Sequence, residues 1–204
     1  MNNNNNAVLI QQVYPNAGME SALALTNERH TNYCKNHLFD FRSVCSNVVQ
    51  GWSLTQGGWA KVALMRVAVQ YGYTFVVWLD ADTVIKDLTT DLRMGCPANG
   101  VGAVRFRYNT FAPHWNVGAL YIRVSSLPDL EHFFDLWIKG YPGPEDQREQ
   151  GVLNALGTEY ITTIDDKWNY VPNRCDPVDA PVVLGFHSTR GVSNKMKAMI
   201  EALQ

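Results

Sequence analysis

The sequence FVVWLDADTVI occupies residues 75–85 and joins a run of strand-forming apolar residues to two carboxylates, Asp80 and Asp82. A nearly continuous apolar run is typical of a strand that is covered on both faces of a sheet. Two carboxylates one residue apart repel each other unless one is protonated or a cation lies between them. Hard oxygen ligands suit Mn²⁺ or Mg²⁺, which often completes its shell with substrate phosphates. The stretch therefore predicts either a metal site for a phosphorylated substrate or a simple turn, because Asp and Thr also favour turns.

The residues before this strand alternate between strand and helix patterns. Strands are predicted at 7–14, 39–46 and 73–80, and helices at 19–38 and 59–72. Gly72 is predicted to cap the second helix at its C-terminus. A β-α-β-α-β order predicts a parallel sheet with helices packed on it. In such sheets ligands bind beyond the carboxyl ends of the strands, which is where Asp80 and Asp82 are expected.

The second half of the chain is predicted to complete the same α/β domain. Strands are expected at 101–106, 116–124, 159–165 and 181–188, and helices at 127–140, 145–157 and 194–203. Residues 1–6 are predicted to be a disordered Asn-rich tail, and residues 7–204 a single domain, either complete or one domain of a larger protein.

The composition excludes several classes of protein. The chain has 204 residues, 46% of them hydrophobic, and a formal net charge of −2, which gives no reason to expect a nucleic-acid partner. No signal peptide is recognisable and no apolar run approaches the ~20 residues of a membrane span, so a soluble, cytoplasmic protein is expected. The four cysteines are widely spaced, so a Cys-based zinc site is not expected.

Two metal-dependent classes of enzyme share the D-x-D feature. Haloacid-dehalogenase-like phosphatases place a nucleophile in D-x-D-x-[TV], here Asp80, and Asp165 and Asp166 could supply their later acidic pair. GT-A glycosyltransferases use D-x-D to hold a divalent ion on the diphosphate of a nucleotide sugar. The phosphatase strand usually opens its domain, whereas about 70 residues precede this one. The position of the strand therefore favours the glycosyltransferase reading.

Further motifs resemble the GT-A glycosyltransferases, especially the family 34 α-galactosyl, α-mannosyl and xylosyltransferases and, more distantly, the glycogenin-like family 8. The matching pieces occur in family order: NYCKNHLFDF, GGWAKVALMRVAVQYGYTFVVWLDADTVI, WNVGALYIRVS, FFDLW, EQGVLNAL and GFHS. The resemblance implies a GT-A (Rossmann-like) fold with a mostly parallel central sheet flanked by helices. It also implies a UDP- or GDP-hexose donor, with UDP favoured, Mn²⁺ or Mg²⁺ as cofactor, and a glycan or glycoconjugate acceptor.

The resemblance assigns the metal to Asp80, Asp82 and His187. Asp82 is the first choice for a direct ligand, Asp80 touches the metal or the ribose, and Ala81 lies between the carboxylates beside the nucleotide. His187 follows a predicted apolar strand, at the place where the family completes its metal shell with a histidine. Neutral imidazole is a plausible ligand for Mn²⁺ beside carboxylates. The alternative for His187 is an ordinary packed or solvated side chain.

The nucleotide is expected to contact residues from both ends of the chain. In the resemblance, Gln12, Val13 and Tyr14 frame the base and ribose. Lys61 of the W-A-K motif faces the nucleotide-sugar pocket, where an ammonium could neutralise phosphate charge. Lys195 is placed to reach the diphosphate, with Arg190 as a rival. For each of these residues a core or surface role is the alternative.

The donor sugar is expected beside Asn116 and Gly118, because a glycine in a strand often marks close approach by a ligand. Glu149 and Gln150 are the candidates for the reacting centre, and Asp146 can share their helix face. The resemblance favours a retaining reaction. The aromatic side chains that could form a sugar platform or belong to the core are Trp115, Trp168 and Tyr170.

The chain departs from family 34 in its short length and in lacking the amino-terminal anchor of the Golgi enzymes. These departures fit a trimmed chain, one domain of a larger transferase, or a bacterial or viral relative. A non-catalytic module that binds a nucleotide sugar is a further alternative, although the D-x-D, histidine and acidic-Gln elements favour an enzyme.

Overall fold

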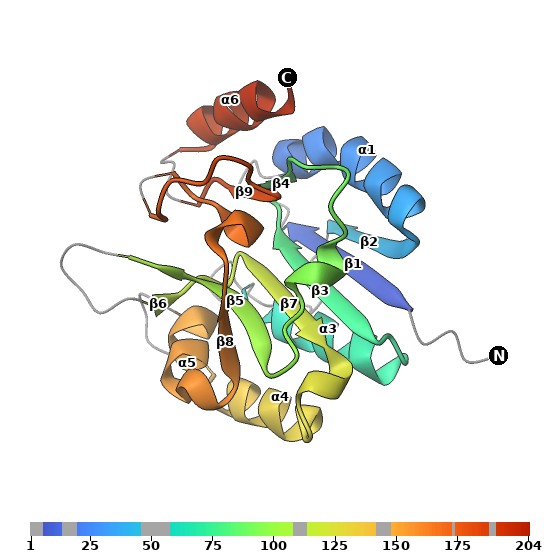
Figure 1. The fold of residues 1–204 in the computed structure, drawn as a ribbon, viewed down its shortest axis with the longest axis vertical. Coiled ribbons are helices and arrows are strands. Elements are labelled where there is room, and N and C mark those ends of the chain that lie inside the picture. Colours follow the sequence, from blue (N-terminus) through green and yellow to red (C-terminus); the bar gives the residue numbers. More distant parts are fainter. Residues whose placement is uncertain are drawn as a thin grey trace.

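The computed structural model describes residues 6–13, 20–45, 58–107, 114–141, 148–172, 174–187 and 191–204, which form a central sheet with helices on both faces (Figure 1). The strands of the seven-stranded sheet are β1 (Ala7–Val13), β2 (Phe39–Cys45), β3 (Phe75–Asp80), β5 (Val101–Phe106), β6 (His114–Trp115), β7 (Ala119–Arg123) and β8 (Ile161–Ile164). A separate antiparallel pair consists of β4 (Thr83–Ile85) and β9 (Val183–Gly185). The helices are α1 (Glu20–His37), α3 (Ala60–Gln70), α4 (Leu130–Lys139), α5 (Arg148–Leu156) and α6 (Val192–Leu203). Short 3₁₀ turns are η1 (Leu92–Gly95), η2 (Val124–Ser126), η3 (Gly157–Glu159) and η4 (Asp166–Asn169).

The sheet is mostly parallel, as the strand and helix order predicts. Its strands lie in the order β2-β1-β3-β7-β5-β6, with β8 beside β5. From the pairings, β1, β2, β3, β5 and β8 run in one direction, and β6 and β7 run in the other. The predicted α/β fold is therefore confirmed. The antiparallel β7 lies between β3 and β5, so residues on its amino-terminal side lie next to the carboxyl end of β3.

Each face of the sheet is covered because alternate strand residues point to opposite sides. Val8 and Ile10 of β1 pack into a core formed with α3, α4 and α5, which includes Phe133 and Trp137. Ala7 and Leu9 pack on the other face. There the core includes residues of α1, η1 and η4: Tyr33, Cys34, Leu92 and Trp168. Both faces are thus covered at the centre of the sheet, which explains the nearly continuous apolar run of β3.

The strands expected at 73–80 and 159–165 are shorter in the structure, as β3 (Phe75–Asp80) and β8 (Ile161–Ile164), and two further predicted strands differ more in their surroundings. The strand expected at 116–124 begins at Ala119, because the side chain of Asn116 accepts a hydrogen bond from the backbone N–H of Gly118 at 2.8 Å and forms a turn. The strand expected at 181–188 narrows to β9 and pairs with β4 outside the central sheet. Both differences lie next to the D-x-D motif.

Helix ends agree closely with the prediction. Gln70 ends α3, and its cap is Tyr71 instead of the predicted Gly72. Gly72 follows with φ +88°, a left-handed conformation that glycine adopts without strain. In α4 the Asp129 side chain accepts a hydrogen bond from the His132 backbone N–H at 2.8 Å. Within the described part of the chain, no helix combines the length and the apolar character that crossing a membrane requires.

Candidate metal and nucleotide-sugar site

The D-x-D motif forms a turn at the carboxyl end of β3. Asp80 is the last residue of β3, and Thr83 begins β4 and donates from its hydroxyl to the Asp80 carbonyl at 2.7 Å. The chain therefore turns at residues 81 and 82, between β3 and β4. The turn interpretation and the metal-site interpretation are both compatible with this geometry, because the turn is what brings the carboxylates together.

A distant histidine completes a cluster with these carboxylates. Ligand atoms of Asp80, Asp82 and His187 all lie within 4.8 Å of one another. The β4–β9 ladder pairs Thr83 with Gly185, and the Phe186 backbone N–H donates to the Asp82 carbonyl at 2.9 Å. This short ladder explains how His187 reaches Asp82 from the other end of the sequence.

Asp82 is buried and paired with two basic groups. Its Oδ1 lies 2.9 Å from Nδ1 of His187, and its Oδ2 pairs with the ammonium of Lys195. Burial alone would raise the pKa of this carboxyl, but His187 and then Lys195 more than offset that effect and hold the pKa well below its usual range. Asp82 is therefore a carboxylate at any working pH, as a metal ligand must be.

His187 has one ring nitrogen beside the carboxylates and the other in the protein interior. Burial alone would lower its pKa, but Asp82 and, further away, Asp80 raise it. Its Nε2 is buried and has no hydrogen-bond partner among the described residues. A side chain on Gly118 would collide with the imidazole and would lie 2.8 Å from Oδ1 of Asn116. Glycine at 118 therefore makes room for the histidine.

Lys61 lies at the start of α3, and its ammonium is fully engaged. Nζ lies 3.0 Å from Oδ1 of Asp80, 3.0 Å from the Val117 carbonyl and 3.4 Å from Oε1 of Glu149. Burial alone would lower the pKa of Lys61, but Asp80 and Glu149 outweigh it and the pKa is raised. An ammonium has three donors, so these contacts occupy all of them. The structure thus places Lys61 between two acidic side chains.

Glu149 and Gln150, at the start of α5, face the same region. Glu149 is buried, and a side chain on Gly58 would overlap its carboxylate, which explains the small residue before α3. The Glu149 carbonyl also accepts from Nε1 of Trp137 at 2.8 Å. Oε1 of Gln150 accepts from the Val117 backbone N–H at 3.3 Å. The structure therefore brings the predicted acidic-Gln element beside the D-x-D strand.

The Asn116–Gly118 turn is held from several sides. Asn116 Nδ2 lies 3.5 Å from Oε1 of Gln150, and the Asn116 Oδ1 accepts from Nδ2 of Asn169 at 2.7 Å. The side chain of Asn154 accepts from the Trp115 backbone N–H at 2.8 Å and donates to the Trp115 carbonyl at 3.0 Å. The turn is therefore rigidly placed, with the Gly118 carbonyl accepting from the Asp80 backbone N–H at 2.8 Å.

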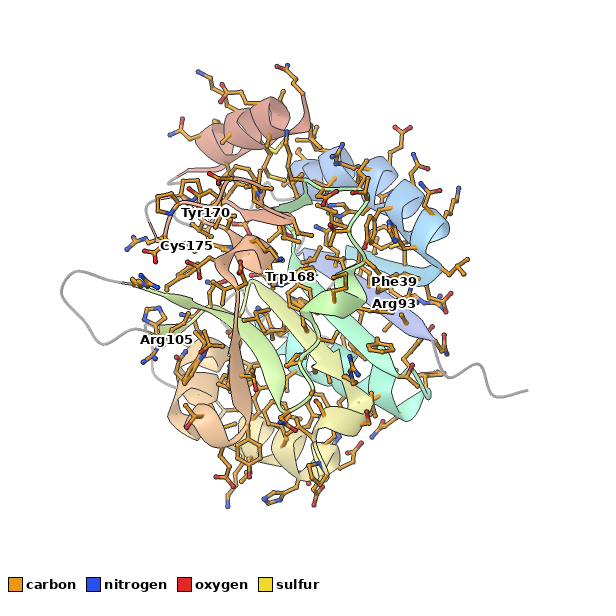
Figure 2. The ribbon with its side chains drawn as sticks, viewed as in Figure 1. Phe39, Arg93, Arg105, Trp168, Tyr170 and Cys175 are labelled. Atoms are coloured by element: carbon orange, nitrogen blue, oxygen red, sulfur yellow. The ribbon has the colours of Figure 1, made fainter. Side chains whose placement is uncertain are left out.

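The three candidate platform aromatics differ in exposure. Trp115 and Trp168 are buried, whereas Tyr170 is half-buried. Nε1 of Trp115 donates to Thr163 at 2.9 Å, and the guanidinium of Arg105 lies 5.5 Å from a Trp115 ring centroid. Trp168 and Tyr170 lie on the segment that links β8 to β9 (Figure 2). Core packing is thus the observed role of the two tryptophans.

A buried polar network below the D-x-D turn escaped sequence reasoning. The Gln11 side chain donates to the Asp80 carbonyl at 3.1 Å, and its Oε1 lies 3.0 Å from Nδ1 of His30. Nε2 of His30 accepts from the Ile85 backbone N–H at 3.1 Å. Asn169, in η4, was also missed. The one signal for Gln11 was a polar pair, Gln11 and Gln12, inside an otherwise apolar strand.

Several predicted residues are not among the described side chains that make up this site. Tyr14, Asp146 and Arg190 lie outside the described residues, and for Gln12 and Val13 only the β1 backbone is described, with Gln12 opposite Asp80 in the register. The pair Asp165 and Asp166 makes local contacts instead. Asp165 accepts from the Lys167 backbone N–H at 2.9 Å, and Asp166 accepts from that of Asp176 at 3.0 Å.

The residues present fit a divalent metal ion. Two carboxylates and an imidazole are a suitable donor set for Mn²⁺ or Mg²⁺, although the imidazole favours Mn²⁺. The three side chains converge at the carboxyl end of β3, where ligands of α/β sheets bind. These residues could therefore hold a metal ion, and the chemistry of the set does not by itself fix which one.

The same arrangement of strands and helices occurs in solved structures of known function. A glycosyltransferase involved in glycosylating the major capsid of the virus PBCV-1 superposes with a TM-score of 0.71 at 13% identity, covering 96% of this chain and 99% of that one. This is the fold of known glycosyltransferases. The glycosyltransferase GlyE of Streptococcus pneumoniae TIGR4 has a TM-score of 0.62 at 13% identity, covering 98% of this chain. The chain spans only 60% of the length of GlyE.

A third glycosyltransferase, mouse xyloside xylosyltransferase 1, has a TM-score of 0.53 at 10% identity, covering 92% of this chain and 99% of that one. No protein-family model and no curated protein matches the sequence. The similarity is thus one of glycosyltransferase fold, and it agrees with the resemblance of the ordered motifs to GT-A enzymes, xylosyltransferases among them.

Proposed function

We propose that this protein is a metal-dependent glycosyltransferase that moves a hexose from a UDP- or GDP-sugar to a hydroxyl of a glycan or glycoconjugate. The observation that carries the proposal is the convergence of Asp80, Asp82 and His187 at the carboxyl end of β3 in a glycosyltransferase fold. The neighbouring structures are glycosyltransferases by name, which supports the reaction class. UDP is the favoured base because the motifs resemble families that use UDP-sugars.

In this proposal Asp80, Asp82 and His187 hold Mn²⁺ or Mg²⁺. When bound, the ion acts as a Lewis acid that stabilises negative charge on the departing diphosphate. Lys195, whose ammonium pairs with Asp82, is the candidate for contact with the diphosphate. Gln12, Val13, Tyr14 and Ala81 remain the candidates for contact with the base and ribose.

The donor sugar would lie beside the Asn116–Gly118 turn and the start of α5. Glu149 and Gln150 face this region, and the buried charge of Glu149 is compensated by Lys61. A carboxylate held in this way can stabilise positive charge that develops at the anomeric carbon. Lys61, whose three donors are engaged, would orient Asp80 and Glu149 rather than contact phosphate. Asp146 stays a candidate from the same helix pattern.

The test is a donor hydrolysis assay with purified protein, Mn²⁺ and a panel of UDP- and GDP-hexoses. Many transferases release free sugar slowly when water replaces the acceptor, so we expect nucleotide diphosphate to appear with one donor and to stop when EDTA is added. Wild type should be compared with Glu149→Gln, which removes the carboxylate but keeps its size. Absence of release from every donor, despite nucleotide binding, would favour a binding module over an enzyme.

The phosphatase alternative makes an opposite prediction. If Asp80 were a nucleophile for phosphate esters, then p-nitrophenyl phosphate would be hydrolysed with Mg²⁺ and a covalent phospho-aspartate would form. The engagement of Asp80 Oδ1 by Lys61 at 3.0 Å and by Trp78 Nε1 at 2.7 Å favours a fixed ligand over an attacking group. We therefore expect no such hydrolysis.

A further inference from the structure

Asn169 is a fully buried amide whose role in the site is not explained by any sequence motif. It ends η4, a turn anchored by the hydroxyl of Tyr121, which donates to the Trp168 carbonyl at 2.7 Å. Nδ2 of Asn169 donates to Oδ1 of Asn116 at 2.7 Å. Its Oδ1 is buried and has no hydrogen-bond partner among the described residues. An unpaired buried carbonyl carries a free-energy cost, so this oxygen needs an explanation.

Nε2 of His187 is also buried without a hydrogen-bond partner among the described residues, and both atoms lie next to Gly185. A Cβ on Gly185 would be 2.7 Å from Oδ1 of Asn169 and 2.8 Å from Nε2 of His187. Glycine at 185 therefore leaves the space between the two atoms open. One atom is an acceptor and the other is a ring nitrogen that can donate, so they are chemically complementary.

The neighbouring acceptor, Oδ1 of Asn116, is already saturated. It accepts from the Gly118 backbone N–H at 2.8 Å and from Nδ2 of Asn169 at 2.7 Å, which uses both of its lone pairs. The backbone N–H can only donate, so it fixes which end of the Asn116 amide faces it. That orientation in turn requires Asn169 to present its NH₂ group to Asn116 and its oxygen away from it.

We propose that Asn169 is a positioning residue for the metal site: after a small shift of either side chain, or through one water, its amide oxygen accepts the Nε2–H of His187 and holds Nδ1 toward Asp82. A chain of hydrogen bonds would then connect the Gly118 backbone, Asn116 and Asn169 to the imidazole of His187. Nδ1 already lies 2.9 Å from Oδ1 of Asp82. Histidines that bind metals usually donate their second ring N–H to such an acceptor, which fixes the tautomer and the ring orientation.

The expected effect on metal binding rests on the proposed metal-dependent function. The placement of Asn169 beside His187 does not. It assigns one amide to two parts of the site, because the same side chain holds Asn116 beside the expected donor sugar and His187 beside the carboxylates. Loss of the Asn169 oxygen should therefore weaken metal binding even though Asn169 does not contact the metal. Partners of this kind typically change metal affinity by 10- to 100-fold when they are removed.

The first test uses NMR of metal-free protein labelled with ¹⁵N-histidine, with the His187 signals assigned by loss in His187→Gln. We expect a slowly exchanging Nε2–H signal in wild type that is lost in Asn169→Leu, which keeps the size of the side chain. Asn169→Asp keeps an acceptor oxygen and should retain the signal. Equal protection of the Nε2–H in wild type and Asn169→Leu would overturn the proposal.

The second test measures Mn²⁺ affinity by EPR with saturating UDP or GDP. We expect roughly tenfold weaker binding in Asn169→Leu and no change in Ser126→Ala. Ser126 is the matched control, since it also loses a buried hydrogen bond, from its hydroxyl to the Gly100 carbonyl at 2.8 Å. Unchanged Mn²⁺ affinity in Asn169→Leu would overturn the positioning role.

The two tests separate this inference from the proposed function. If wild type binds no Mn²⁺ with either nucleotide, the proposed function fails, while the NMR comparison still decides whether Asn169 holds His187. If Asn169→Leu does not fold, Asn169→Ser replaces it, because a hydroxyl is too short to reach the imidazole and leaves less apolar bulk in the core. The same losses of the Nε2–H signal and of Mn²⁺ affinity are then expected.

Discussion

At the scale of single residues, the buried ammonium of Lys61 is the most heavily used charge in the site. It compensates Asp80 and Glu149, and its side chain is almost completely buried. Removing one member of a buried ion pair leaves its partner charged in a poorly solvated place, which typically costs 3–5 kcal/mol. The site therefore depends on Lys61 for stability as well as for the orientation of its carboxylates.

The corresponding prediction concerns Lys61→Met and a double mutant. Lys61→Met should lower the free energy of unfolding by about 3–5 kcal/mol. Adding Glu149→Gln should restore part of this loss, because the uncompensated carboxylate is then neutral. Urea unfolding at neutral pH measures both, with exposed Lys35→Met as the control. Strictly additive losses in the double mutant would show that Lys61 and Glu149 do not interact.

At the scale of elements, α6 brings Lys195 to Asp82 and is held by a small core of its own. Met199 is fully buried, in a cluster with Ala22 of α1, Val84 of β4 and Phe186. In Figure 1 α6 lies beside the start of α1 at one end of the molecule. Lys86 also donates to the Ala202 carbonyl at 2.6 Å. Among the described residues, this apolar cluster and the Lys86 hydrogen bond help to position the helix that carries a site cation.

The prediction for this element is that Met199→Ala loosens α6 and its neighbours. Truncation of a buried methionine should cost about 2–5 kcal/mol, and amide hydrogen exchange should rise in α6 more than in β1 or β3. Met94→Ala is the matched control because Met94 is 71% exposed in η1. Uniform acceleration of exchange over the whole chain would indicate that α6 is not a separate unit of stability.

At the scale of the whole molecule, the Gln11–His30 network joins β1, α1 and β4 beneath the D-x-D turn. Burial, and to a lesser extent Arg29, lowers the pKa of His30 to about 3 from its ordinary 6.5. The neutral ring is therefore the folded form, with Nε2 as acceptor for Ile85. A group with a depressed folded-state pKa contributes stability that is present above the unfolded pKa and is lost as pH falls.

We predict that the protein loses stability in acid and that the loss is smaller in His30→Gln. Protonation of His30 in the unfolded chain should remove about 3 kcal/mol of unfolding free energy between pH 7.5 and pH 4, at ~1.4 kcal/mol per unit of pKa. The difference in unfolding free energy between wild type and His30→Gln should therefore become smaller as the pH falls over this range. Denaturant titrations at several pH values check it, with exposed His132→Gln on α4 as the control. Parallel stability curves for wild type and His30→Gln would contradict the role of His30.

The fold could be predicted from sequence where local patterns decide it. The β-α-β-α-β order predicted the parallel half of the sheet. The apolar run of 75–79 predicted that Asp80 and Asp82 lie at the end of a buried strand. The antiparallel β7 between β3 and β5 was not predictable, since strand pairing between distant segments leaves no local pattern. The same holds for the β4–β9 ladder, which decides that His187 meets Asp82.

The candidate site was predictable in its residues but not in its connections. Sequence motifs pointed to Lys61, Asp80, Asp82, Glu149 and His187, which the structure gathers in one region. The partners of Lys61 and the roles of His30 and Asn169 depend on contacts between distant elements. Buried amides and a neutral histidine carry no sequence pattern, because their chemistry is defined by what folding places next to them.

The most direct test of the central claim is a calorimetric titration of UDP and GDP into wild type and Asp82→Asn, with and without Mn²⁺. We expect binding of at least one nucleotide that requires Mn²⁺ and is lost in Asp82→Asn, because the amide removes a charged metal ligand while keeping its shape. Such a result would identify the preferred base and establish the site at β3. Absence of binding to either nucleotide in wild type with Mn²⁺ would contradict the account.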